Sequence, residues 1–340
     1  EMLEIEPSNT TNILSNNDGK SCQHIQNNML NPKCIGSHQE LAIAGACSGY
    51  YQDKVFLFSG LNNFGYSSRL WLYHSVSLCV KEIVRRDDEV WPKARGYGAG
   101  GIIHLPNANT GQKRAYFVIY GGVANGFDFL SDIWLFDIEK ACWIEVKAEN
   151  IGPSVCSATF GLLEQHQSLI VWGGVGDGYK NNDQLWQFNF QTHMWQVIDT
   201  TNKPIGAKAQ AFCQSNDGYT LYCTGGTRYL HAMKKTQSFH DLYALDLKVY
   251  FDQKTSKPKW TKLVDHPEHL VANALKYIEQ DGKVYLVGLF INETTKKYLV
   301  SLLDLQKLGS WQFIVQPDDA MVGCHFASVH VLENSSTNAN

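Results

Sequence analysis

The stretch SLIVWGGVGDGYKNNDQLWQFNFQTHMWQVI, residues 168–198, joins a strand-forming run directly to two glycines, Gly173 and Gly174. Two further strand-like runs follow, and the second of them carries Trp195. A glycine pair at the end of a strand lets the backbone adopt positive φ and pass close to a neighbouring segment. The stretch therefore predicts a strand that leaves a tightly packed sheet abruptly.

The same pattern recurs along the chain. Glycine pairs end the runs AYFVIYGG, LIVWGG and TLYCTGG, and degenerate copies are VFLFSG, ending at Gly60, and VYLVGLF, around Gly288. Each copy is followed by a second strand-like run, which carries an aromatic residue at a repeated place in four copies: Trp71, Trp134, Trp186 and Tyr243. A third signal is a short unit in which an aromatic residue precedes an apolar residue by three positions. The aromatic residue is a tryptophan in four copies: Trp143, Trp195, Trp260 and Trp311. Self-similarity at about 50 to 60 residues indicates a repeat architecture.

A strand rich in small residues precedes each glycine signal: LAIAGACSG, GAGGIIHL, CSATFGLL, KAQAFCQS and VANALKYI. The innermost strands of radially arranged sheets converge on an axis, where bulky side chains would keep them apart. Each unit therefore predicts one four-stranded sheet, and consecutive sheets packed around an axis form a β-propeller. The repeated tryptophans are expected between neighbouring blades, where aromatic burial stabilises the packing.

The order of these signals, a glycine pair after the second strand, an aromatic residue in the third and a tryptophan some twenty residues later, resembles the kelch-repeat family over about residues 41–332. The resemblance implies an all-β kelch-type β-propeller. Kelch propellers serve as ubiquitin-ligase substrate receptors, scaffolds, secreted adhesion modules and, rarely, enzyme domains, so the function has to be argued from the site. Of the arginine that often begins a family repeat, this chain keeps Arg95, with Lys208 in a corresponding place.

Five full units cover about residues 41–316, and a sixth innermost strand, MVGCHFASVHVL, follows at 321–332. Because an unpaired sheet edge is disfavoured, we expect a six-bladed ring whose last blade is closed partly by the N-terminal segment, with EMLEIE as an outer strand. A five-bladed ring and a truncated chain are the alternatives. The domain boundaries that follow are a loop-rich N-terminal segment at 1–40, a propeller at 41–333 and a disordered tail at 334–340.

The composition favours protein or peptide partners. Hydrophobic residues make up 44% of the 340 and charged residues 18%, which is typical of a soluble globular protein. A net charge of -4 without a basic stripe argues against nucleic acid, and no apolar run approaches the roughly 20 residues needed for membrane insertion. We expect a cytoplasmic protein; the sequons at Asn9, Asn292 and Asn334 keep a secreted or cell-surface location as the alternative.

Candidate reactive groups are few. Cys22, His24, Cys34 and His38 are of the type that binds zinc, but their spacing matches no finger pattern, and a Cys22–Cys34 disulfide is an alternative. The motif HPEH at 266–269 has a proline where a zinc-protease helix would be needed. The chain has no nucleophile elbow and no phosphate-binding glycine loop. We therefore expect no enzyme, no metal and no cofactor, with a sugar oxidase or isomerase as the alternative.

The loops predicted at one end of the propeller are rich in aromatic residues and arginine, the residue types most enriched at protein-interface hot spots. They join the second strand of each blade to the third, or one blade to the next. We expect a non-catalytic interaction module, a scaffold or adaptor subunit, with an adhesion or receptor module as the alternative. About half of the aromatic residues are expected to fasten their own loops. The candidate binding residues are Phe64, Tyr66, Arg85, Arg86, Trp91, Arg95, Phe127, Phe129, Tyr179, Arg228 and Tyr229.

Overall fold

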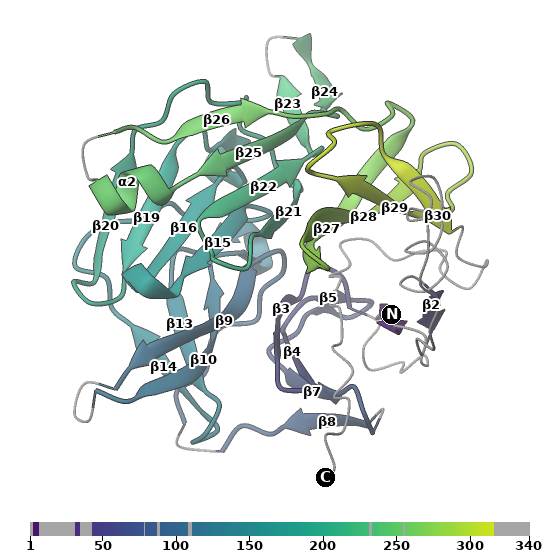
Figure 1. Ribbon diagram of the computed structural model, residues 1–340. Helices are drawn as coiled ribbons and strands as arrows, with labels where there is room; N and C mark the ends of the chain where they lie inside the picture. Colours follow the sequence, from purple (N-terminus) through teal and green to yellow (C-terminus); the bar gives the residue numbers. More distant parts are fainter. Residues whose placement is uncertain are drawn as a thin grey trace.

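The computed structural model describes residues 3–6, 31–34, 43–77, 79–86, 89–107, 111–230, 233–253 and 256–315. These residues form five antiparallel four-stranded sheets, which Figure 1 shows arranged radially about a common centre. The chain is thus an all-β propeller, as the repeats predict, and five blades are described. None of the helices in these ranges has the length and apolar character that crossing a membrane requires.

In each blade the four strands follow one another in chain order from the innermost to the outermost. Blade 1 contains β3 (Cys47–Tyr51), β4 (Lys54–Phe58), β7 (Leu70–His74) and β8 (Cys79–Ile83). Blade 2 contains β9 (Ala99–Pro106), β10 (Lys113–Tyr120), β13 (Ile133–Asp137) and β14 (Cys142–Val146). Blade 3 contains β15 (Thr159–Leu163), β16 (Ser168–Trp172), β19 (Leu185–Asn189) and β20 (Met194–Ile198).

Blade 4 contains β21 (Ala211–Gln214), β22 (Thr220–Thr224), β25 (Leu242–Asp246) and β26 (Lys259–Lys262), with α2 (Lys248–Gln253) between the last two strands. Blade 5 contains β27 (Leu270–Gln280), β28 (Lys283–Asn292), β29 (Tyr298–Asp304) and β30 (Gln312–Val315). Among the innermost strands, β3 contacts β9, β9 contacts β15, β15 contacts β21 and β21 contacts β27. A Cβ at Gly100 in β9 would lie 2.5 Å from the backbone nitrogen of Ser48 in β3. This close approach explains why the inner strands are rich in small residues.

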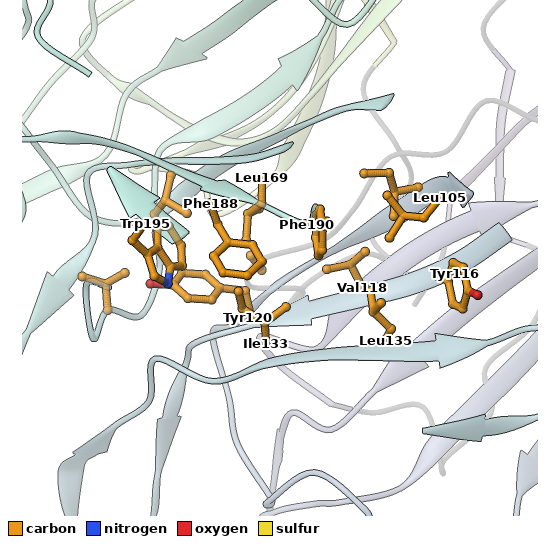
Figure 2. Packing of buried hydrophobic residues seen from close by; sticks show 14 residues of the cluster. Leu105, Tyr116, Val118, Tyr120, Ile133, Leu135, Leu169, Phe188, Phe190 and Trp195 are labelled. Carbon is orange, nitrogen blue, oxygen red and sulfur yellow. The ribbon is translucent and has the colours of Figure 1, made fainter. Parts of the chain in front are cut away.

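Apolar side chains fill the spaces between neighbouring blades. Figure 2 shows the cluster between blades 2 and 3, where Val118, Tyr120 and Leu135 face Phe188 and Trp195. The ring of Trp195 lies 5.2 Å from that of Tyr120 in the preceding blade. Trp143 contacts Phe58 and Trp260 contacts Trp172 in the same way, each with ring centroids 5.0 Å apart. The predicted position of these tryptophans between blades is confirmed.

Glycines at the strand exits fasten blades 1 to 3 to the loop that leads into the next blade. Gly173 and Gly174 have φ values of 68° and 82°, and the Gly174 N–H donates a 2.8 Å hydrogen bond to the Ala207 carbonyl oxygen in the loop before blade 4. The Gly60 and Gly122 N–H groups donate equivalent 2.9 Å bonds to the Arg95 and Val155 carbonyls. The abrupt exit predicted for the opening stretch is therefore a docking point between blades.

Small hairpins follow these exits in blades 1 to 4. They are β5 (Leu61–Asn62) with β6 (Gly65–Tyr66), β11 (Val123–Ala124) with β12 (Asp128–Phe129), β17 (Val175–Gly176) with β18 (Lys180–Asn181), and β23 (Thr227–Leu230) with β24 (Lys235–Ser238). Each of these hairpins also contacts the loop that leads into its own blade. The contact is an antiparallel β-bridge made by the first residue of β5, β11, β17 or β23. In blades 2 and 3 the hairpin turns are the 3-10 helices η2 (Asn125–Phe127) and η4 (Asp177–Tyr179).

Blade 5 lacks this arrangement. Gly288, predicted to be a degenerate copy of the glycine pair, lies inside β28, which continues unbroken to Asn292, and its partner strand β27 has a register shift between Ala272 and Ala274. A single glycine between Val287 and Leu289 keeps its place in the ladder and pairs with Leu275. The loop after β28 is accordingly a tight turn closed by an Asn292 side chain that accepts bonds from the Thr294 and Thr295 N–H groups.

The outward faces of blades 1 and 5 are also apolar. Val55 and Trp71 in blade 1 and Val287 and Leu302 in blade 5 are buried on the faces turned away from the adjacent described blade. The predicted sixth inner strand, 321–332, lies outside the described residues. Strand β1 (Leu3–Glu6), predicted to help close the ring, pairs with β2 (Asn31–Cys34) in a separate two-stranded sheet. Ring closure by the two ends of the chain stays a prediction.

We predict that Gly173→Ala destabilises the propeller strongly. The new Cβ would lie 2.5 Å from the Ala207 carbonyl oxygen at a positive φ, so backbone strain and overpacking together should cost roughly 3 kcal/mol. The control is Gly178→Ala, where φ is 64° and no atom lies within 4 Å of the new Cβ, so only about 1 kcal/mol of strain is expected. Chemical denaturation of both variants measures the difference, and equal losses would contradict the docking role of Gly173.

Candidate binding face

Two kinds of loop emerge at one end of the propeller. The loops between second and third strands cover residues 59–69, 121–132, 173–184 and 225–241, and the inter-blade loops cover 84–98, 147–158 and 199–210. We call this end the loop face. The opposite end, the hairpin face, carries the turns at 51–54, 164–167, 190–193, 215–219 and 280–283.

Phe127 and Tyr179 form an exposed aromatic pair on the loop face. The two rings come from equivalent turns of blades 2 and 3, and their centroids are 6.0 Å apart. Phe127 is 68% exposed and Tyr179 is 51% exposed. Both residues have positive φ, 62° and 56°, a conformation that is uncommon for bulky side chains and often marks a functional site.

Further apolar side chains are exposed on the same face. Phe64 stands at the tip of the β5–β6 hairpin and is 99% exposed. Tyr229 in β23 is 40% exposed, and Figure 1 shows the β23–β24 hairpin projecting from the body of the propeller. Ile151 and Ile205, on inter-blade loops, are exposed as well. Sequence reasoning missed these two isoleucines because it considered only aromatic and arginine side chains.

Tyr66 and Phe129 have a different role from the exposed aromatics. Both pack against a buried cluster of Val123, Cys156 and Val175, which lies under the loops. The ring of Tyr66 leaves so little room that a Cβ at Gly96 would lie 2.5 Å from it. These two side chains fasten their own loops to the blades, as expected for part of the aromatic set, and we leave them out of the binding surface.

Arg95 lies in the interior. Its side chain is fully buried and forms a bidentate ion pair with Asp132, with nitrogen–oxygen distances of 2.6 and 2.8 Å. The guanidinium also donates to the Lys93 and Gly121 carbonyls. Burial alone would raise the pKa of Asp132, but the hydrogen bonds and charge of Arg95 outweigh it, and the pKa is lowered. Arg95 thus joins an inter-blade loop to the loop that precedes the third strand of blade 2.

Arg228 is also bound within the protein. Its guanidinium forms a bidentate ion pair with Asp183, at 2.6 and 3.0 Å, and donates to the Gly206 carbonyl at 3.0 Å. These contacts join the β23–β24 hairpin, the loop of blade 3 and the loop between blades 3 and 4. Bidentate arginine–carboxylate pairs fix geometry well. Arg228 therefore fixes the positions of these loop segments. Its guanidinium is already bound within the protein.

The remaining candidates lie between blades 1 and 2. Trp91 is half-buried, donates from Nε1 to the Ser68 carbonyl at 2.6 Å and lies 6.1 Å from the ring of Trp143. Arg86 is exposed, and its Nε lies 3.6 Å from Oε1 of Glu89. Arg85 is exposed as well. The contacts of Trp91 are with β14 and the blade 1 loop, so these residues belong to a sector of the loop face apart from the Phe127–Tyr179 pair.

A cavity of about 820 Å³ follows the axis of the propeller. All five innermost strands line it, from Tyr97 and Ser157 at the loop face to Glu164 and Asp217 at the hairpin face. The Ser157 N–H donates to the Tyr97 carbonyl and the Ala209 N–H to the Ser157 carbonyl, so backbone hydrogen bonds between blades frame the loop-face end. The cavity wall combines small residues of the inner strands with larger side chains such as Tyr50, Phe160 and Phe212.

Several reactive side chains are buried or paired, whereas the Cys79 thiol is exposed. Burial raises the pKa of the Cys47 and Cys223 thiols to about 12, which keeps them protonated. His104 and Glu164 bind each other, with Nδ1 and Oε1 2.5 Å apart, across blades 2 and 3. Within the described ranges, no group of three or more His, Cys, Asp or Glu side chains could hold a metal ion. Of the candidate zinc ligands, Cys22, His24 and His38 lie outside the described residues.

We predict that Arg95→Met lowers the stability of the propeller by about 3–5 kcal/mol, because it leaves the Asp132 carboxylate without its buried partner. Arg85→Met is the matched control, since Arg85 is exposed on the same loop and should change stability by less than about 0.5 kcal/mol. Thermal and chemical unfolding measure both effects. A loss for Arg95→Met no larger than that for Arg85→Met would show that the ion pair does not support the loop.

Comparison with known proteins agrees with the architecture. No curated protein is significantly similar in sequence to the chain. A family model described as the KLHDC2/KLHL20/DRC7 Kelch-repeats domain matches residues 108–336, which is more than half of the chain and includes most of blade 2 and all of blades 3 to 5. With five radially arranged blades and glycine pairs at the strand exits, the chain belongs to this family of kelch-repeat propellers.

Proposed function

We propose that the chain is a non-catalytic interaction module, a scaffold or adaptor subunit, that binds a protein partner through its loop face. Kelch-repeat propellers generally bind proteins, and this chain is one of them. The observation that carries the choice of face is the Phe127–Tyr179 pair, two exposed rings in contact across two blades. Function in this fold resides in the loops on a rigid scaffold.

The energetics favour these rings as an anchor. Exposed aromatic rings lose solvent-accessible apolar area when a partner covers them, at about 25 cal/mol per Å², and tyrosine and phenylalanine are enriched at interface centres. Holding Phe127 and Tyr179 at positive φ costs about 1 kcal/mol for each residue. Their contact in this costly conformation has an explanation if a partner uses both rings together.

The loop face is also preorganised for binding. Hydrogen bonds from Gly122 and Gly174 fasten the two loops that carry the aromatic pair to the neighbouring inter-blade loops. The Arg95–Asp132 and Arg228–Asp183 ion pairs hold the same region from both sides. Loops that are already ordered lose little conformational entropy on association, which improves affinity. The hairpin face, by contrast, consists mainly of short polar turns.

We propose further that the module works in a reducing compartment such as the cytoplasm. Six cysteines in the described residues are free thiols, and four of them are buried: Cys47, Cys156, Cys213 and Cys223. Free buried thiols are ordinary in cytosolic proteins, whereas secreted proteins commonly bridge their cysteines. Mass-spectrometric mapping of thiols in protein from its native source tests this point, and a disulfide or an occupied sequon would contradict it.

We predict that Phe127→Ala combined with Tyr179→Ala abolishes partner binding while the fold is retained. Partners captured from the native source on the wild-type chain provide the ligand, and their affinity for the double variant should fall at least about thirtyfold, because two hot-spot side chains each contribute about 1–2 kcal/mol or more. Calorimetry or surface plasmon resonance measures the loss.

The control for this experiment is Ile144→Ala combined with Met194→Ala. These side chains are similarly exposed but lie on the outer strands β14 and β20. The control should bind as the wild type does. Wild-type affinity of the Phe127/Tyr179 variant, or equal losses in the two double variants, would show that the partner uses another surface.

A further inference from the structure

The loop face over blades 3 and 4 is cationic although the whole chain has a net charge of -4. Its loop segments 173–184, 199–210 and 225–241 contain six cationic residues and four carboxylates: Asp177, Asp183, Asp199 and Asp241. Asp199 forms an ion pair with Lys257 and Asp241 with Lys262, both outside these segments. Asp183 is bound to Arg228. The other five cations are lysines, and among the described residues none of their ammonium groups forms an ion pair: Lys180, Lys203, Lys208, Lys234 and Lys235. We call these five residues the lysine patch.

The Arg228 contacts hold the three segments together. Arg228 on β23 binds the Asp183 carboxylate in the first segment and the Gly206 carbonyl in the second. Lys203 donates to the Asp183 carbonyl at 3.1 Å, and Lys208 forms a backbone bridge with Thr227. The three backbone segments that carry the lysine patch are therefore held to one another.

Apolar side chains lie within and beside the lysine patch. Tyr179 immediately precedes Lys180 and contacts Phe127. Ile205, 56% exposed, stands between Lys203 and Lys208, next to the Gly206 carbonyl that Arg228 binds. Tyr229 follows Arg228 on the projecting hairpin. A ligand that covers this region meets alternating ammonium groups and apolar side chains.

We propose that the segment a partner places on the loop face is an acidic peptide with at least one large apolar side chain, held by the lysine patch and by the Phe127–Tyr179 pair. This inference rests on the proposed function and names the chemistry of its partner. Carboxylates complement five ammonium groups that form no ion pair within the described part of the chain, and the apolar side chain covers the exposed rings and Ile205. The net negative charge of the rest of the chain repels an acidic segment elsewhere, so the patch also selects the face.

A peptide fits the observations better than a single-stranded nucleic acid does. Proteins that bind single strands present aromatic faces on which successive bases stack. Here the Phe127 and Tyr179 rings are tilted by 59° against each other, and the side chain between the lysines of the second segment is the aliphatic Ile205. An aliphatic and tilted aromatic surface is suited to the branched and aromatic side chains of a peptide.

A displayed library of random dodecapeptides, selected on the full chain, tests the proposal. We expect the enriched peptides to carry net negative charge and at least one aromatic or large aliphatic residue. Their affinity, measured by fluorescence anisotropy with synthetic peptides, should fall at least about tenfold when NaCl is raised from 50 to 500 mM, because salt screens exposed charges. Enrichment of neutral or basic peptides, or no enrichment of acidic ones, would overturn the proposal.

Matched charge-reversal variants locate the site. The triple variant Lys180→Glu, Lys208→Glu and Lys235→Glu should bind the selected peptides with an affinity lower by at least about thirtyfold. Lys113→Glu, Lys140→Glu and Lys307→Glu make the same change of net charge with exposed lysines of the hairpin face and should leave at least half of the affinity. Thermal unfolding verifies that both variants fold. Equal losses would mean that the peptides sense only net charge.

Two further comparisons separate the inference from the proposed function. If binding of the selected peptides requires Phe127 and Tyr179 but not the charge of the lysine patch, the proposed binding face is supported and the proposed acidic character of the partner is wrong. If they tolerate loss of both rings, the proposed function fails as well. An oligouridylate 12-mer that binds more tightly than the selected peptides would assign the patch to nucleic acid and overturn the peptide.

Discussion

The hydrogen bond from a glycine at the strand exits of blades 1 to 3 to the carbonyl of the next incoming loop is the contact on which the remaining structure depends. Gly60, Gly122 and Gly174 donate it to Arg95, Val155 and Ala207. A propeller is held by contacts between neighbouring sheets, and apolar side chains alone set their spacing without fixing their loops. This backbone contact fixes the loops too, because the donor and the acceptor lie at the same end of adjacent blades. It requires positive φ and a close approach, and only glycine meets both needs without strain.

The binding face is a consequence of this constraint. Since every glycine exit in blades 1 to 4 lies at the loop face, the small hairpins that follow it stand side by side on a rigid base. Phe127 and Tyr179 occupy equivalent turns of two such hairpins and so come into contact. The lysines gather by the same geometry, with Arg228 as the link between three loops. Side chains far apart in the sequence thus share one surface without a dedicated domain.

Much of the fold could be predicted because its causes repeat. The glycine pairs, the small inner-strand residues and the blade tryptophans each recur with a fixed spacing, and the structure places Trp143, Trp195 and Trp260 between blades. The candidate site was less predictable. Arg95 has the character of a surface arginine in the sequence, since its partner Asp132 lies 37 positions later. Tyr66 and Phe129 differ from Phe64 and Phe127 only in their position within a turn, which composition does not show. Strand β28 continues past Gly288 because it has one glycine where the other blades have two, or Ser59–Gly60.

The most direct test of the account is amide hydrogen exchange of the full chain with and without a partner captured from its native source. Buried and hydrogen-bonded amides exchange slowly, and a partner slows exchange further where it covers the surface. If the partner binds the loop face, added protection is expected at residues 121–132, 173–184, 203–210 and 225–241. No added protection is expected at the hairpin-face turns 164–167, 190–193, 215–219 and 280–283. Protection confined to the hairpin-face turns, with unchanged exchange in the four loop-face segments, would contradict the account.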